Sequence, residues 1–351
     1  MKKISKTTRS NLITYAMVVA AFVIMQILSV TGHVSNSLAG QLVPICVYIC
    51  MAVSLNLTVG ILGELSLGHA GFMSVGAFTG VVVAMSIQNA AGPVRLVLAI
   101  VIGGIMAGIA GVIVGVPVLR LRGDYLAIVT LAFGEIIRSL VNVLYIGVSD
   151  GRLRFSFLTK DMPEGTVMLV DGAKGAVKIK PISTFTVGFV LILITLFVVL
   201  NLINSRAGCA IKATRDNRIA AESMGIPVTK YKMIAFTTAA ALAGMAGALY
   251  GLNSSTVVPT QFTFNQSINV LVFVVLGGLG NVLGSVISAT LLTVLPEVLR
   301  AFSDYRMLAY AIVLILVMIF TNNPLIRSFV NRLFSPIKRL FRKNKQGGDI
   351  A

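Results

Sequence analysis

The sequence predicts an all-α polytopic integral membrane protein with about ten membrane-embedded helices, some of them glycine-broken or re-entrant. Of the 351 residues, 56% are hydrophobic and only 12% are charged, and the mean hydropathy is +0.93. Apolar runs long enough to cross a hydrocarbon core of roughly 30 Å recur along the whole chain. The alternating segments of about ten residues that mark a membrane β-barrel are absent.

The expected segments follow the apolar runs in order. The first is longer than the apolar part of a usual signal peptide, so we expect an uncleaved helix there, although residues 37–39 resemble a cleavage site. The whole set is 11–30, 41–61, 66–88, 95–118, 124–146, 185–203, 232–252, 264–278, 281–299 and 305–321.

Positive charge predicts how these segments are oriented. The formal net charge is +17, and basic residues cluster in 1–10 and 327–351, on either side of the apolar body. Because basic residues beside spans mark the cytoplasmic side, we expect a cytoplasmic N-terminus at 1–10, a transmembrane domain at 11–326 and a cytoplasmic tail at 327–351. The same placement favours membrane lipid as a partner and argues against nucleic acid.

Counting spans from the N-terminus assigns the two longest connections to opposite sides. The loop at 147–184 is expected outside, and the basic loop at 204–232 is expected in the cytoplasm. In the outer loop, the runs 167–170 and 177–179 flank a glycine-containing stretch and predict a small hairpin. Contact with an external partner and a neutral insertion are both compatible with this loop.

Region 264–299 is the least regular of the apolar stretches. Read as one span, it would leave the basic tail outside, against the charge rule. A break at the glycine-rich stretch 277–281 restores a cytoplasmic tail. A re-entrant or broken helix is the alternative, since irregular backbone is tolerated in a membrane where protein surrounds it.

Small residues recur every four positions in two of the expected spans. This spacing lets helix backbones approach closely, so tight packing without chemistry is expected there. The residues are Gly103, Ala107, Gly111 and Gly115 in one span and Ala243, Gly247 and Gly251 in the other.

Several other classes are excluded by what the sequence lacks. There is no Gly-x-x-x-x-Gly-Lys-Ser/Thr loop, so this chain is not expected to bind ATP through a P-loop. The two histidines and three cysteines do not gather with carboxylates at metal-ligand spacing. We therefore expect no catalytic residues, no metal site and no enzyme.

Polar residues inside the apolar segments are the candidates for a translocation path, because each needs a compensating partner in hydrocarbon. Asn56, Glu64 and His69 lie in a glycine-interrupted stretch, and a tight cytoplasmic turn with a solvated Glu64 is the alternative. Glu135 is three residues before Arg138, so the two can also form a self-contained ion pair on one helix face. Glycine interruptions at 60–71 and 277–284, one in each half, are typical of a transporter's central site.

The basic loop at 204–232 has a helical pattern of apolar and charged residues. Residues 212–227 are expected to form a helix with apolar residues on one face and charged residues on the others. The apolar set is Ile219, Ala220, Met224 and Ile226, and the charged set is Arg215, Asp216, Arg218 and Glu222.

The chain resembles the LivM-type permease subunits of bacterial ABC importers for branched-chain amino acids. The resemblance is carried by three passages that span most of residues 45–300 in order: 55–72, 121–138, and 205–225 continuing to 243–250 and 275–280. It implies a multi-pass permease of the bacterial cytoplasmic membrane that forms the path for branched-chain amino acids.

The partners implied by the resemblance are a second permease subunit (LivH-type), two ABC ATPase subunits and an extracytoplasmic solute-binding protein. ATP would be bound by the ATPases, so no cofactor is expected in this chain. The family's coupling helix carries Glu-Ala-Ala-x-x-x-Gly, and here Ile219 stands in place of the glutamate. The implied coupling residues are Arg215, Asp216, Ala220, Ala221, Glu222 and Gly225.

Two departures from the family's sequence pattern bear on which cargo is carried. Position 64 is Glu where the family commonly has Gln, and the loop at 147–184 lacks the family's glycine-proline passage. Related permeases for nucleosides or urea are an alternative. An ion-driven secondary transporter, with Glu135 as its ion site, is another, and a non-transporting scaffold would not need interrupted spans.

Overall fold

The structure is a computed structural model that describes residues 6–31, 36–87, 90–121, 123–149, 152–157, 167–300 and 305–322. The predicted basic tail at 327–351 and the first five residues lie outside the described residues. The chain divides into two units, residues 1–294 and 295–351. In the second unit, the described part contains α12 (Arg306–Asn322) and an ion pair between Glu297 and Arg300.

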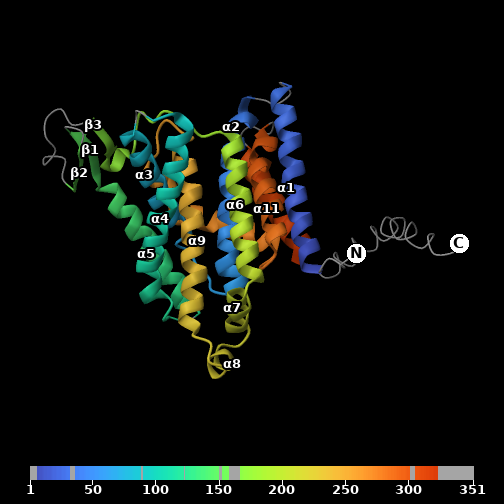
Figure 1. Ribbon diagram of the computed structural model, residues 1–351. Helices are drawn as coiled ribbons and strands as arrows, with labels where there is room; N and C mark the ends of the chain where they lie inside the picture. The colour runs from blue at the N-terminus through green and yellow to red at the C-terminus, as the bar shows by residue number, and fades with distance from the viewer. Residues whose placement is uncertain are drawn as a thin grey trace. The chain divides into compact units, whose positions relative to one another are not determined.

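Helices make up most of the first unit (Figure 1). Six helices among the described residues are long and apolar enough to cross a membrane: 37–62, 69–86, 92–118, 125–142, 185–204 and 228–251. In full, the helices are α1 (Lys6–Val30), α2 (Asn36–Asn56), α3 (His69–Ser86), α4 (Gly92–Val118), α5 (Asp124–Asn142), α6 (Phe185–Asn204), α7 (Arg206–Asp216), α8 (Arg218–Ser223), α9 (Val228–Gly251), α10 (Phe264–Gly277) and α11 (Val282–Val298).

The prediction of a polytopic helical membrane protein is therefore confirmed, but ten complete spans are not. With 14 residues, α10 rises only about 21 Å, which is short of the roughly 30 Å hydrocarbon core. The chain breaks between α10 and α11 at residues 278–281, where the glycine-rich sequence predicted an interruption.

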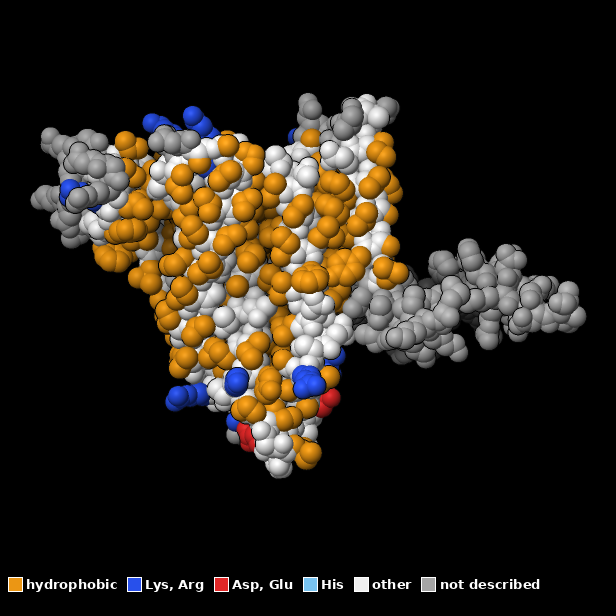
Figure 2. Space-filling view, in the orientation of Figure 1, with side chains coloured by type: hydrophobic (Ala, Val, Ile, Leu, Met, Phe, Trp, Pro, Cys, Tyr) orange, Lys and Arg blue, Asp and Glu red, His pale blue; other side chains and the backbone are white. Residues whose placement is uncertain are grey.

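Helices α3, α4 and α9 pack with their backbones in close approach. A Cβ added to Gly76 of α3 would overlap the carbonyl oxygen of Gly244 on α9, and one added to Gly244 would overlap Ala107 of α4. The small residues at four-residue spacing thus serve close packing. The outer side of α4 exposes Val97, Val101, Ile105, Ile109 and Ile113, and Figure 2 shows apolar side chains covering this face of the helical body.

A small antiparallel sheet corrects the all-α prediction. Strand β1 (Tyr145–Ser149) is central, between β2 (Arg152–Ser156) and β3 (Val167–Asp171). The predicted hairpin of 167–170 with 177–179 is wrong, because β3 pairs with β1, and Ala176 forms an isolated bridge to Val257.

The expected span at 124–146 ends early because α5 stops at Asn142 and β1 follows it, supplying the pairing edge for both other strands. A turn does form after β3, where Lys174 contacts Asp171 at 2.9 Å. Hydrogen bonding to Asp171 raises the pKa of Lys174 above its ordinary value.

The two glycine interruptions meet inside the first unit, at a contact that we call the glycine junction (Asn56, Gly60, Gly280 and Ser285). Helix α2 continues into a π-helical turn, η1 (Leu57–Leu62), which lies against the α10–α11 turn. A Cβ on Gly60 would overlap the backbone nitrogen of Gly280. The buried Asn56 amide accepts from Gly280 N at 2.8 Å and donates to Ser285 Oγ at 2.9 Å.

Replacing Gly76 tests the backbone approach between α3 and α9. The substitution Gly76→Ala should lower the free energy of unfolding by about 1–3 kcal/mol, because the new methyl group overlaps the Gly244 backbone. Thermal unfolding in detergent measures this change. Gly40→Ala is the matched control in α2, since nothing lies within 4 Å of its Cβ position, and an equal loss in both variants would contradict the packing account.

Replacing Asn56 tests the glycine junction. Asn56→Leu should destabilise the fold by about 1–3 kcal/mol, because the part-buried N–H of Gly280 loses its acceptor. The matched control is Asn265→Leu on α10, whose side chain is exposed. If the unfolding temperatures of the two variants coincide, the junction does not have the role assigned to it.

Candidate functional site

The basic loop at 204–232 forms two short helices rather than the single helix predicted over 212–227. Asn217 adopts an extended conformation between α7 and α8, and its side chain accepts from Ala220 N at 3.1 Å, which caps α8. Asparagine competes in this way with a continuous helix, because its short side chain can bond the backbone locally. We call residues 206–227 the coupling segment, after the role that the resemblance implies for them.

The coupling segment lies at one end of the first unit, and α8 is its outermost part (Figure 1). The sheet lies at the other end, beside α3 and α5. Ile219 on α8 and Met224 directly after it are 77% and 82% exposed, whereas Ala221 is buried. Gly225 ends α8 with a φ of +78°, a conformation that favours glycine. An exposed apolar tip with a sharp reversal behind it is a surface suited to a protein partner.

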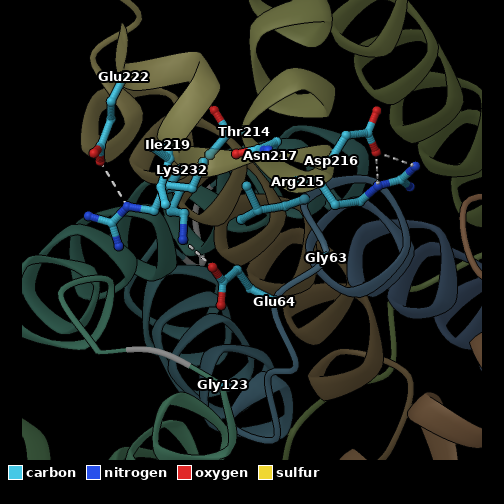
Figure 3. Close-up of a pocket in the computed structure, with 12 residues that line it drawn as sticks. Gly63, Glu64, Gly123, Thr214, Arg215, Asp216, Asn217, Ile219, Glu222 and Lys232 are labelled. Carbon is cyan, nitrogen blue, oxygen red and sulfur yellow. Dashed lines mark hydrogen bonds and ion pairs between the residues drawn. The ribbon is translucent and has the colours of Figure 1, made fainter.

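Charged side chains surround a cavity of about 450 Å³ between the coupling segment and the end of η1. Figure 3 shows Arg215 pointing to Asp216, and Lys232 pointing to Glu64. Two of the three guanidinium nitrogens of Arg215, Nε and Nη2, donate to Asp216 Oδ1 at 3.2 Å. On α8, Arg218 contacts Glu222 at 2.8 Å.

Glu64 lies in this cavity rather than beside the other polar candidates of the membrane domain. Its carboxylate pairs with Lys232 of α9, and the two side chains are only 15% and 7% exposed. The sequence prediction placed Glu64 with Asn56, His69 and Glu135, but the fold groups it with Arg215, Asp216 and Glu222. Lys232 was missed, because a lysine that opens an apolar run is typical of a flanking residue.

The other polar candidates occupy separate places. Asn56 belongs to the glycine junction, as described above. His69 begins α3, and its Nε2 lies 2.8 Å from Ser54 Oγ in a fully buried position. Next to it, the Ala70 amide donates to Ser267 Oγ of α10 at 3.0 Å. These bonds satisfy buried polar groups and join α2, α3 and α10.

Glu135 joins α5 to the start of α10. Its Oε2 accepts from Arg138 Nε at 2.6 Å, and its Oε1 accepts from the backbone N–H of Phe264 at 3.2 Å. The two charged side chains are 34% and 26% exposed, although they lie within a span. A partly exposed ion pair within a span requires a protein partner or an aqueous path beside it.

Two residues that the sequence analysis overlooked lie on α10, the helix whose first amide bonds Glu135. Asn265 and Asn269 on α10 are exposed, one helical turn apart. The polar run 265–267 inside an apolar stretch was the signal that could have found them. Among the described residues, no group of three or more His, Cys, Asp or Glu is arranged to hold a metal.

The sequence is similar to those of known transport proteins. Residues 37–321 match the family described as the branched-chain amino acid transport system / permease component. Over 285 residues the chain is 37% identical to the high-affinity branched-chain amino acid transport system permease protein LivM of Salmonella typhimurium and equally to that of Escherichia coli. Each match covers 78% of this chain and 66% of the relative, so the chain spans just under two thirds of their length.

A more distant relative is the fructose import permease protein FruG of Bifidobacterium longum. It is 26% identical over 240 residues, which cover 66% of this chain and 67% of the relative. No solved structure is matched.

The matched region contains η1, the glycine junction, the coupling segment and the Glu135–Arg138 pair. Its family is one of transport permeases rather than of enzymes. The chain, a multi-pass membrane protein, therefore belongs to the family of branched-chain amino acid transport system permease components.

Proposed function

We propose that this chain is the transmembrane permease subunit of an ABC importer for branched-chain amino acids in a bacterial cytoplasmic membrane. It works with a second permease subunit of the LivH type, two ABC ATPase subunits and an extracytoplasmic solute-binding protein. The observation that carries the proposal is the coupling segment, an exposed and partly apolar pair of helices at one end of the bundle.

The coupling segment supports docking of an ATPase. Ile219 and Met224 expose apolar surface at its tip, and Arg218 and Glu222 pair beside them. This mixture of a central apolar contact and a polar rim is typical of a protein interface. ATP binding and hydrolysis in the partners would move this segment, and the chain would alternate between outward and inward access.

The translocation path in this proposal follows the polar side of α5 and α10. Glu135 and Arg138 supply charge, and Asn265 and Asn269 supply exposed amides on a short, membrane-embedded helix. Intramembrane polar groups of this kind face a bundle interior or a water-filled cavity. A zwitterionic amino acid has charges that such a lining can accompany.

The choice of cargo rests on the names of the relatives. Those at 37% identity are described as branched-chain amino acid permeases, and two at 26% as a fructose permease and a probable branched-chain amino acid permease. The relatives thus differ in cargo, and higher identity favours the amino acids over sugars, nucleosides or urea.

An ion-driven secondary transporter finds less support. That alternative needs a carboxylate free to bind an ion or proton, and Glu135 was its candidate. Both Glu135 oxygens already accept hydrogen bonds, from Arg138 and from the Phe264 backbone. The Glu64 carboxylate is likewise engaged, with Lys232.

Purification and reconstitution test the proposed function. Mild-detergent isolation from the native membrane should recover two ATPases and a second permease with this chain. The recovered complex, placed in proteoliposomes with its solute-binding protein, should take up labelled leucine when ATP is enclosed with the ATPases. Uptake driven by a proton or sodium gradient without ATP, by the chain purified alone, would overturn the proposal.

Changing Gly225 tests the tip of the coupling segment. Gly225→Val should reduce ATP-dependent leucine uptake at least about tenfold, because a β-branched residue is strained at a φ of +78°. Nothing lies within 4 Å of its Cβ position, so the effect comes from the backbone alone. The chain should still insert and reach the membrane at normal levels.

The control for this change is Gly92→Val at the start of α4, where a Cβ also meets nothing within 4 Å and φ is not positive. Normal uptake by the Gly225 variant in intact complexes would show that the tip conformation is not needed for coupling.

A further inference from the structure

We infer that Arg215 and Lys232 hold the end of η1 as a clasp, so that movement of the coupling segment reaches the α10–α11 turn. The clasp is defined by Arg215 and Lys232 on one side and by Gly60 and Glu64 on the other. The inference rests on the proposed function and assigns Arg215 a different task from docking: it is a positioning residue whose guanidinium reaches the backbone at the end of η1.

The first contact of the clasp is a hydrogen bond from Arg215 to the backbone. Its Nη1 donates to the Gly60 carbonyl oxygen at 2.8 Å. In an α-helix, that carbonyl would accept from the amide of Glu64. Here the amides of Gly63 and Glu64 both bond to Thr58 O, so the wider turn leaves the Gly60 carbonyl for the guanidinium. Arg215 therefore replaces a helical bond that the π-turn removes.

Gly63 makes room for this contact. Its φ of +79° ends η1, and a Cβ at that position would lie 2.5 Å from Cγ of Arg215. Only glycine meets both requirements, the left-handed backbone and the space for the arginine stem. The backbone at the break therefore leaves room for a side chain from α7, although Gly63 and Arg215 are 152 positions apart in the sequence.

The second contact is the ion pair between Lys232 and Glu64. Lys232 lies in the first turns of α9, directly after the coupling segment, and Glu64 lies just beyond η1. Both side chains are mostly buried, and an unpaired charge in such a place is strongly unfavourable. The coupling segment is therefore fastened to residues 60–64 from both of its sides, by α7 and by α9.

The clasp continues into the membrane domain through the glycine junction. The residue whose carbonyl Arg215 binds, Gly60, packs against the backbone of Gly280, and Asn56 bonds the same turn. Beyond that turn, α10 runs to Phe264, whose amide bonds Glu135 on α5. Hydrogen bonds at the two ends of α10, together with backbone packing at Gly60, thus join the coupling segment to the proposed path. Displacement of residues 60–64 would carry the start of α11 and the end of α10 with it.

The test is the number of leucine molecules transported per ATP hydrolysed by the reconstituted complex. Arg215→Ala should lower this ratio at least about tenfold, while ATP hydrolysis stays within about twofold of the unaltered complex. A purely structural defect would reduce both rates or the yield of complex together. Arg120→Ala is the control, since Arg120 is exposed just after α4 and belongs to neither the coupling segment nor the clasp.

Charge exchange supplies a second, independent variant. Lys232→Glu should lower the leucine-to-ATP ratio, and adding Glu64→Lys should restore it, because the pair is re-formed with its charges reversed. Restoration supports a clasp. Failure to restore the ratio, in complexes that assemble and hydrolyse ATP, counts against it.

The inference and the proposed function can fail separately. If the unaltered complex shows no ATP-dependent leucine uptake, the proposed function fails. If it does show uptake, and Arg215→Ala retains the normal leucine-to-ATP ratio, the proposed function stands and the clasp is wrong.

Discussion

The buried amide of Asn56 joins the two places where the helices of this protein are interrupted. Backbone groups that leave a regular helix inside a membrane must find partners in the protein, because hydrocarbon offers none. Asn56 provides an acceptor for Gly280 N and a donor for Ser285 Oγ. Without that amide, the α10–α11 turn would present an unpaired N–H to η1. The interruptions in the two halves of the chain are therefore mutually dependent.

The same requirement explains the positions of several charged residues. The Gly60 carbonyl, released by the π-turn, accepts a hydrogen bond from Arg215, and the first amide of α10 donates one to Glu135. In each case a charged side chain completes an irregular stretch of backbone, and such charge-assisted bonds are stronger than neutral ones. The charged side chains thus stabilise short and broken helices. Because each bonds the backbone of another element, it could also pass a movement of its own helix to that element.

The extent to which the sequence predicted this arrangement depended on the range of each interaction. The breaks near Gly60 and at 277–281 were predictable, because glycine acts on its own backbone. The interruption of the coupling segment at Asn217 was not, since a capping bond competed with a helix-favouring pattern. Pairing of Glu64 with Lys232 spans 168 positions, and pairing of β3 with β1 depends on where α5 ends. Such contacts are set by the tertiary fold and leave little trace in local pattern.

The most direct measurement of the central claim is the distance between the coupling segment and the α10–α11 turn in the assembled complex. Spin labels at Arg206 of α7 and at Leu279, both exposed, report this distance when the exposed Cys209 is replaced by serine. The account predicts one narrow distance distribution that is the same with and without bound nucleotide, and that broadens in an Arg215→Ala background. A distance that changes on nucleotide binding in the unaltered chain would mean that the coupling segment moves independently of the glycine junction, contrary to this account.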